Sequence, residues 1–361
     1  MNRSDSTEDL DQSMETTERP SHIDKAELAE IQAQAEGLAQ QLAEKPDGDL
    51  VGQIITTALK LLRDQTNRGD IKLINKSFQE LRYALKVFAP YRDVRKVSIF
   101  GSARTLQNHS DYRQAAAFGK AMTQAGWMVI TGAGGGIMEA GHGGGGAEKS
   151  FGLAIRLPFE QKTNTVIAND PKLVNFKYFF TRKLMFVRSS HAIALFPGGF
   201  GTMDEGFEVL TLVQTGKSAP MPIVFIDSPG SGYWRAWQDY VEKQLMGRGL
   251  VGQSDLRLYR ITSDVDEAVH EIRHFYSNYH SIRFARHDLI IRLHRAPTAV
   301  QLAELSAEFG DLSDKHAFRV SKPLAVERDE TTLANLPRLV FPFNRKDHGR
   351  LRVLIDRLNE I

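Results

Sequence analysis

The stretch LFPGGFGTMDEGFEVLT, Leu195–Thr211, decides the fold. It begins in the apolar run AIALF (Ala192–Phe196), passes through a proline and three glycines, and continues into two adjacent acids and an apolar segment. A buried strand that turns through glycine directly into a helix is the repeating unit of parallel α/β sheets. The stretch therefore predicts one strand–turn–helix unit of such a sheet.

The same unit recurs on both sides of this stretch. Apolar runs predict strands at Val97–Phe100, Trp127–Thr131, Leu153–Pro158, Ala192–Phe196, Pro222–Asp227 and Leu258–Thr262. Helical spacing between them predicts helices over Tyr112–Ala125, Lys177–Ser189 and Trp234–Leu245, one that starts in the PGGFGT segment, and one that starts at Asp264. Strands that are apolar on both faces are typical of parallel sheets covered by helices. We expect an α/β fold with a doubly wound, Rossmann-like parallel sheet.

Additional segments flank this sheet and give four predicted parts. Residues 1–20 are polar and predict a disordered tail. Residues 21–93 form an N-terminal helical extension with three apolar stripes, interrupted at Pro46-Asp47-Gly48. Residues 94–280 form the α/β domain. Residues 281–361 form a small C-terminal α+β appendix, with strands expected at Leu289–Leu293, Phe318–Val326 and Arg338–Phe343, and helices at Thr298–Phe309 and the C-terminus.

Composition excludes several classes of function. The 361 residues include no cysteine, which rules out disulfides, thiol chemistry and cysteine-ligated zinc. The net charge of +2 does not indicate nucleic-acid binding, and we expect the arginines of the appendix to form a solvated face. No apolar run approaches the roughly 20 residues of a membrane helix, and no signal peptide is evident. We expect a cytoplasmic protein that contacts neither membrane nor nucleic acid.

Ligands of open parallel sheets bind beyond the carboxyl ends of the strands. Four stretches occupy such positions, namely Gly101–Arg104, Thr131–Gly141, the segment around Phe180–Lys183, and Pro197–Glu205. Glycines before a helix let backbone N–H groups approach an anion, and the helix dipole favours phosphate there. A plain tight turn is the alternative. Two glycine-rich helix starts indicate either two anion sites or one shared site.

The first glycine-rich start does not fit a dinucleotide site. Gly132 and Gly134 match the first two glycines of G-x-G-x-x-G, but Ile137 replaces the third, and the acidic ribose ligand is missing. Nine of the fifteen residues in Gly132–Gly146 are glycine, so the helix is either short or held by packing. His142 lies in this run, and a lone histidine there is more often incidental than an acid–base catalyst.

The second start contains an acid that is hard to explain. Thr202-x-x-Glu205 has the spacing of a capping box, in which Glu205 would only bond to a backbone N–H. A carboxylate next to a bound phosphate is otherwise repelled by it. It makes sense if the substrate is a phosphorylated sugar whose reacting centre lies a few ångströms from the phosphate, where Glu205 could stabilise an oxocarbenium-like transition state or orient water.

PGGFGTMDE, with TRK upstream and TGAGGGIMEA earlier, resembles the Lonely Guy (LOG) family, whose signature is P-G-G-x-G-T-x-x-E and which is often labelled "lysine decarboxylase". The resemblance covers roughly Lys96–Asp227. It implies hydrolysis of nucleoside 5′-monophosphates to a free base and ribose 5-phosphate. The terminal extensions are absent from short cytokinin-producing members, which favours a larger bacterial-type nucleosidase or one regulated through its added segments.

The resemblance also implies roles for individual residues. Arg182, of the R-K pair before the signature, and Glu205 correspond to the catalytic residues. The residues that correspond to the family's substrate- and phosphate-binding positions are Ser102, Gly134, Gly135, Gly136, Met138, Lys183, Gly198, Gly199, Gly201 and Thr202.

The predicted function is therefore hydrolysis of the N-glycosidic bond of AMP-like monophosphates, with cytokinin riboside monophosphates as a further substrate class. The alternative is a nucleotide-binding module without catalysis. Neither a cofactor nor a metal is expected, and pyridoxal-phosphate chemistry has no support in the residues. Family members are dimers or larger, so we expect a homo-oligomer, with the apolar Leu28–Leu42 stripe as a candidate part of its interface.

Overall fold

The computed structural model describes residues 24–157, 163–313 and 318–361, so the predicted disordered tail lies outside the described residues. The described chain divides into two compact units, one up to Tyr83 and one from Ala84 to Ile361. Each unit is described by itself.

Helices make up the first unit. They are α2 (Lys25–Ala43), α3 (Gly48–Arg63) and α4 (Arg68–Phe88), the last of which continues into the second unit. Asp24 caps α2, because its carboxylate accepts a hydrogen bond from the amide of Ala26. The chain leaves α2 just before Pro46, where the sequence predicted the break. The prediction of an N-terminal helical extension is confirmed.

A seven-stranded parallel sheet forms the centre of the second unit, in the order β4-β3-β2-β1-β5-β6-β7. Its strands are β1 (Lys96–Phe100), β2 (Met128–Thr131), β3 (Ser150–Ile155), β4 (Leu173–Phe176), β5 (Ala192–Leu195), β6 (Ile223–Ile226) and β7 (Arg260–Thr262). Residues of β1, β2, β5 and β6 are buried throughout, as expected for strands covered on both faces. The predicted doubly wound fold is confirmed.

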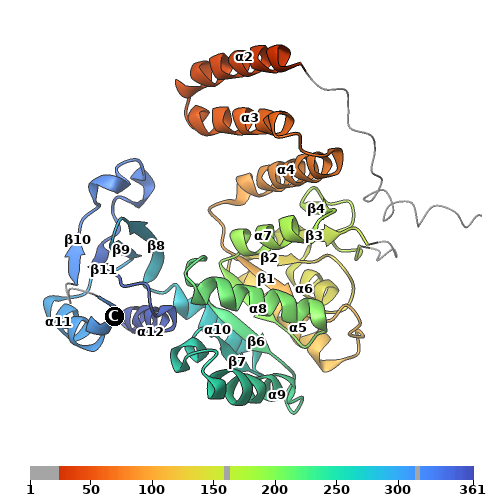
Figure 1. Ribbon diagram of the computed structural model, residues 1–361. Coiled ribbons are helices and arrows are strands. Elements are labelled where there is room, and N and C mark those ends of the chain that lie inside the picture. Colours follow the sequence, from red (N-terminus) through yellow and green to blue (C-terminus); the bar gives the residue numbers. More distant parts are fainter. Residues whose placement is uncertain (1–23, 158–162, 314–317) are drawn as a thin grey trace, which may run out of the picture. The chain divides into compact units, whose positions relative to one another are not determined.

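Helices cover this sheet, as Figure 1 shows. They are α5 (Ser110–Gln124), α6 (Ile137–Gly145), α7 (Phe179–Ser189), α8 (Phe200–Gln214), α9 (Tyr233–Tyr240) and α10 (Val265–Phe275). The glycine-rich α6 is both short and tightly packed. A Cβ at Gly144 would lie 1.9 Å from the carbonyl oxygen of Ala116 on α5, so only glycine lets these two helices approach so closely.

Several element predictions were wrong. Strand β4 was missed, because LVNF is short and carries an exposed asparagine within its apolar pattern. The helix expected over Trp234–Leu245 changes after Tyr240 to a π-helical turn, Val241–Leu245. The strand expected over Phe318–Val326 is limited to β10 (Arg319–Ser321), because Pro323 and a short 3₁₀ turn follow.

The C-terminal part is a four-stranded antiparallel sheet in the order β10-β11-β9-β8, packed with two helices. Its elements are β8 (Tyr279–Ala285), β9 (Asp288–Leu293), α11 (Ala299–Glu308), β11 (Arg338–Pro342) and α12 (His348–Asn359). Strand β8 was not predicted. The Asn359 amide oxygen accepts hydrogen bonds from the backbone of Asn278 and Tyr279, which ties the end of α12 to the start of β8. None of the helices described here is long and apolar enough to span a lipid bilayer.

Candidate active site

Strands β1 and β5 are neighbours at the centre of the sheet, and the chain continues from them toward opposite sides of it. This is the switch point at which open parallel sheets bind their ligands. A cavity of about 820 Å³ lies there. Its lining comes from the ends of β1 and β3, from the loops that follow the strands, and from the starts of α6, α7, α8 and α9. It comprises Phe100, Gly101, Ser102, Ala103, Arg104, Gly132, Ala133, Gly134, Met138, Ala154, Ile155, Leu157, Thr163, Phe179, Arg182, Gly198, Gly199, Phe200, Gly201, Thr202, Met203, Asp204, Glu205 and Tyr233.

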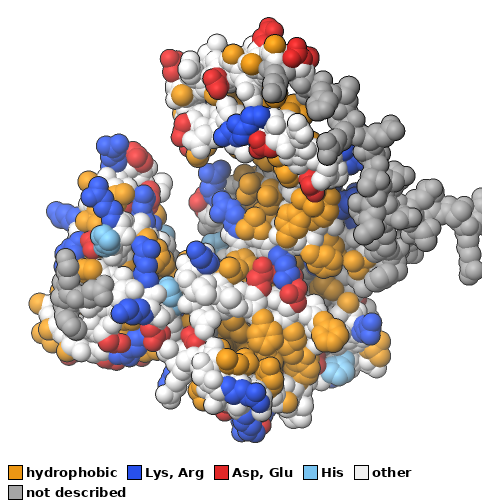
Figure 2. Space-filling view, in the orientation of Figure 1, with side chains coloured by type: hydrophobic (Ala, Val, Ile, Leu, Met, Phe, Trp, Pro, Cys, Tyr) orange, Lys and Arg blue, Asp and Glu red, His pale blue; other side chains and the backbone are white. Residues whose placement is uncertain are grey.

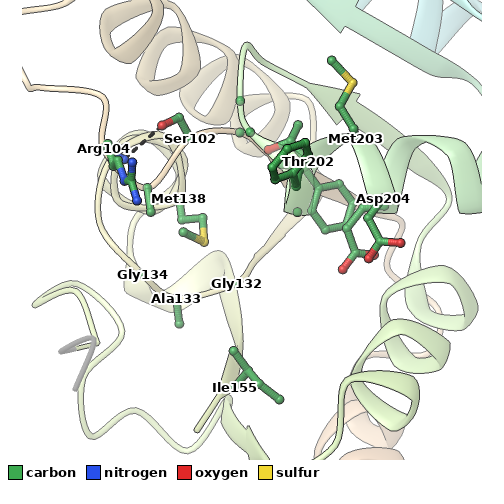
Figure 3. A pocket seen from close by; sticks show the side chains of 18 of the residues that line it. Ser102, Arg104, Gly132, Ala133, Gly134, Met138, Ile155, Thr202, Met203 and Asp204 are labelled. Carbon is green, nitrogen blue, oxygen red and sulfur yellow. Dashed lines mark hydrogen bonds between the residues drawn. The ribbon is translucent and has the colours of Figure 1, made fainter. Parts of the chain in front are cut away.

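Ser102 connects the two glycine-rich helix starts. Its amide donates to the carbonyl of Pro197, before α8, and its carbonyl accepts from the amide of Ile137, the first residue of α6. Figure 3 shows Ser102, Arg104 and Met138 on one side of the cavity, and Thr202, Met203 and Asp204 on the other. Both helix N-termini therefore border one cavity, which supports a single shared anion site rather than two.

The start of α8 rules out the capping-box interpretation of Glu205. The helix begins at Phe200 with Gly199 as its N-cap, and no side chain caps it. Thr202 thus lies within the first turn and Glu205 in the second, too far along the helix to reach the N-cap amide. Glu205 has no role as a cap in this structure.

Glu205 is instead an underpaired acid at the cavity. Its side chain is only 6% exposed, and its Oε2 atom has no hydrogen-bond partner among the described residues. Burial raises the pKa of Glu205 to about 7, although the positive charges of Arg182 and Lys183 oppose that rise. An underpaired buried carboxyl is costly to a folded protein, so its presence at a cavity indicates a function.

Arg182 reaches the same cavity from α7. Its Nε donates to the carbonyl of Leu153 at 2.8 Å, and its guanidinium lies 5.1 Å from the ring centre of Phe186. A Cβ at Gly132 would lie 2.4 Å from Nη2 of Arg182 and 2.6 Å from the sulfur of Met138. The absence of a side chain at Gly132 is therefore what admits Arg182 to this position.

Lys183, unlike the adjacent Arg182, does not line the cavity. Its Nζ lies 2.9 Å from Asp204 and 3.0 Å from Glu208, so it joins α7 to α8. The cavity lining includes the predicted residues Arg182, Glu205, Ser102, Gly134, Met138, Gly198, Gly199, Gly201 and Thr202, but not Gly135, Gly136 or Lys183. Gly136 is the N-cap of α6. The binding and catalytic roles assigned to all of these residues stay predictions.

Tyr233 and Arg104 are two of the lining residues that were not predicted as site residues. The Tyr233 hydroxyl, from the start of α9, donates to the carbonyl of Gly198 and so braces the turn before α8. Arg104 ends the Gly101–Arg104 stretch and is exposed at the cavity. The place of Tyr233 after β6 puts it at the same edge of the sheet as the other loops, but nothing in the local sequence distinguishes it. In the described ranges, no group of three or more His, Cys, Asp or Glu side chains could hold a metal ion.

These features define a Rossmann-like domain with a cavity suited to an anionic ligand. Residues 135–272 match the family model described as "Possible lysine decarboxylase", the label that Lonely Guy domains carry. The resemblance to that family is thereby confirmed for this part of the chain. Family and fold together support a nucleotide-processing or nucleotide-binding role. No curated protein matches the chain significantly.

Solved structures with a similar fold match about half of the chain. A molybdenum cofactor binding protein from Rippkaea orientalis is 16% identical, with 50% of this chain and 94% of that chain covered and a TM-score of 0.36. The molybdenum cofactor carrier protein from Chlamydomonas reinhardtii is 18% identical, with coverage of 50% and 96% and a TM-score of 0.35. DNA processing protein A from Helicobacter pylori, described as binding single-stranded DNA, is 13% identical, with coverage of 48% and 78% and a TM-score of 0.34.

Proposed function

We propose that the protein hydrolyses the N-glycosidic bond of nucleoside 5′-monophosphates, with AMP-like purine nucleotides as the preferred class and cytokinin riboside monophosphates as a further class. Water adds to C1′ of the ribose, the bond from C1′ to the base nitrogen breaks, and the base leaves with a proton. The products are the free base and ribose 5-phosphate.

The observation that carries the proposal is the state of Glu205. A protein that only holds a phosphorylated ligand has no use for a buried, underpaired carboxyl beside the phosphate, because a carboxylate repels it. A hydrolase that breaks a glycosidic bond does need one. The pKa of about 7 lets Glu205 exist as a carboxylate at neutral pH and still accept a proton.

The positions of the other residues suit them to bind the phosphate and to position the ribose. The backbone N–H groups at the start of α8, together with Thr202, would hold the 5′-phosphate. Arg182 would offset negative charge on the phosphate or position the ribose. Glu205 would then lie near C1′, where it stabilises the developing ribosyl cation or takes a proton from the attacking water. This chemistry requires no cofactor and no metal ion.

The direct test is to incubate the purified protein with AMP and with the other common nucleoside monophosphates, without added metal, and to separate the products by chromatography. Free adenine together with ribose 5-phosphate is the expected result, and the set of monophosphates ranks the bases. If AMP binds in calorimetry but no base is released from any monophosphate, the hydrolase proposal is wrong and the protein is a nucleotide-binding module.

We also propose that the protein acts as a homo-oligomer. Apolar side chains are exposed on α7 and α8 next to the cavity, including Phe179, Phe180, Leu184 and Phe207, and Phe200 at the cavity is 97% exposed. Figure 2 shows hydrophobic side chains gathered on this face. Such patches mark association surfaces. Light scattering should give a mass of at least two chains, whereas a monomer would contradict the proposal. Deletion of residues 1–92 tests whether the helical extension takes part.

A further inference from the structure

We propose that three buried side chains outside the cavity, Thr131, His142 and Asn164, are positioning residues that hold the glycine-rich wall Gly132–Gly136 in the conformation that receives the nucleotide. We call them the Thr131–His142–Asn164 cluster. The inference rests on the proposed function, because it assigns the nucleotide to this wall. It was not foreseen from the sequence, in which Asn164 lies 22 residues beyond His142.

The cluster contacts the wall through three hydrogen bonds, and a fourth bond, from another residue, fixes the position just after the wall. The amide of Ala133 donates to Thr131 Oγ1 at 3.0 Å, and the carbonyl of Ala133 accepts from the amide of Asn164 at 2.9 Å. The Asn164 side-chain nitrogen donates to the carbonyl of Gly134 at 2.9 Å. The amide of Ile137, just after the wall, donates to Ser102. Three successive peptide groups of the wall, from Gly132 to Gly135, are thus fixed by side chains or backbone from outside it.

His142 holds the two other members in place. Asn164 Nδ2 lies 3.1 Å from His142 Nδ1, while His142 Nε2 lies 3.0 Å from the carbonyl of Phe151 and 3.1 Å from Thr131 Oγ1. If Nδ1 accepts from the amide, Nε2 carries the proton and donates to the carbonyl. His142 and Thr131 are fully buried and Asn164 is 6% exposed, and none of the three lines the cavity. Burial lowers the pKa of His142, in keeping with a neutral ring.

The backbone of the wall explains why such support is needed. Ala133 has φ of +63°, a left-handed conformation that residues with a Cβ rarely adopt. Its methyl group is buried, at 1% exposure. A residue keeps such a strained backbone conformation only when contacts from the surrounding structure fix it. Without the cluster, the glycines would allow many conformations, and the N–H groups at the start of α6 would no longer be preorganised for an anion.

The test compares two variants with one matched control. Thr131→Val keeps the shape of a β-branched strand residue and removes the hydroxyl, and Asn164→Ala removes the bond to Gly134. Thr123→Val is the control, because Thr123 is also buried and its hydroxyl donates to Gly119 within α5, away from the cavity. Amide hydrogen exchange of peptides covering residues 132–138, without nucleotide, reads the wall directly. KM and kcat for AMP read its role in the reaction.

We expect both cluster variants to exchange at least tenfold faster in residues 132–138 and to raise KM for AMP about tenfold, with kcat changed less than threefold. The control should leave exchange and KM unchanged even if it lowers the melting temperature. Exchange at the wild-type rate in both variants would overturn the inference whatever the kinetics, and so would faster exchange with an unchanged KM. If the wild-type protein neither binds nor cleaves any monophosphate, the proposed function fails, and exchange alone shows whether the cluster holds the wall.

Discussion

Glu205 in the α/β domain and Glu327 in the 3₁₀ turn Ala325–Glu327 of the C-terminal part are both buried glutamates, but their surroundings are opposite. Glu327 is 2% exposed, and its carboxylate accepts from Arg292 Nε at 2.8 Å, Arg338 Nε at 3.2 Å and the amide of Leu324 at 3.0 Å. Glu205 is about as buried, at 6% exposed, yet one of its oxygens has no partner among the described residues.

The pKa values follow from these surroundings. Burial alone would raise the pKa of Glu327, but the amide of Leu324 and the two guanidinium groups outweigh it and lower the pKa. Burial dominates at Glu205 and raises its pKa to about 7. Burial of an acid is therefore not by itself a sign of function. A fully paired acid holds a fold together, whereas an underpaired acid at a cavity leaves room for a ligand or a reaction.

The largest expected effect is on the rate of AMP hydrolysis, which should depend on Glu205 and not on Glu327. Glu205→Gln should reduce kcat for AMP hydrolysis by about 10³-fold or more, because the amide can neither accept a proton nor stabilise a cation. Glu327→Gln should change kcat/KM of the folded protein less than about twofold, because Glu327 lies in a 3₁₀ turn of the C-terminal part and does not line the cavity. Steady-state assays of free base measure both. Retention of a tenth of the wild-type rate by Glu205→Gln would contradict its assigned role.

The next largest effect is on stability, where we expect Glu327 to matter more than Glu205. Glu327→Gln should lower the free energy of unfolding by about 3 kcal/mol, because the buried Arg338 loses the carboxylate that it pairs with and Arg292 keeps only its pair with Glu330. Glu330→Gln is the matched control, since its side chain pairs with Arg292 and Arg283 but is 30% exposed, and we expect a smaller loss. Urea unfolding at pH 7 measures both variants. Equal losses would show that burial of Glu327 does not set its contribution.

Much of the fold could be predicted from the sequence, because buried parallel strands are apolar throughout. The runs at β1, β2, β5 and β6 show this pattern, and glycine follows two of them. Strand β8 was missed because YHSIRFA is half-buried along most of its length and mixes polar with apolar residues. Its neighbour in the sheet is β9, which follows it in a short hairpin, so the strand was missed for lack of a regular apolar pattern and not because its partner is distant.

The candidate site was predictable where its chemistry lies in one contiguous motif. Glu205 and Thr202 fall in the signature, and Arg182 precedes it at the family's distance. Tyr233 was not found, because a tyrosine at a helix start has no distinguishing pattern. The polar side chains that support the wall could not be found either, because a buried histidine bonded to a distant asparagine looks like any other polar residue in the sequence. Long-range pairing, rather than residue type, gives these side chains their roles.

The smallest effect concerns stability as a function of pH. The pKa of Glu205 is raised from its ordinary value of 4.5 to about 7, so between these values the folded protein binds more protons than the unfolded chain. The free energy of unfolding therefore falls as the pH rises through this window, and Glu205 is destabilising above it. Glu205→Gln should thus make the protein more stable at pH 8, by roughly 1–3 kcal/mol, and should have little effect near pH 4.5. Glu327 has a lowered pKa, so its contribution has the opposite sign and is lost as the pH falls.

Urea unfolding of Glu205→Gln and the wild type at both pH values measures the difference. A Gln variant that is less stable at pH 8 would mean that Glu205 is fully paired in solution, and the contrast between the two acids would then disappear.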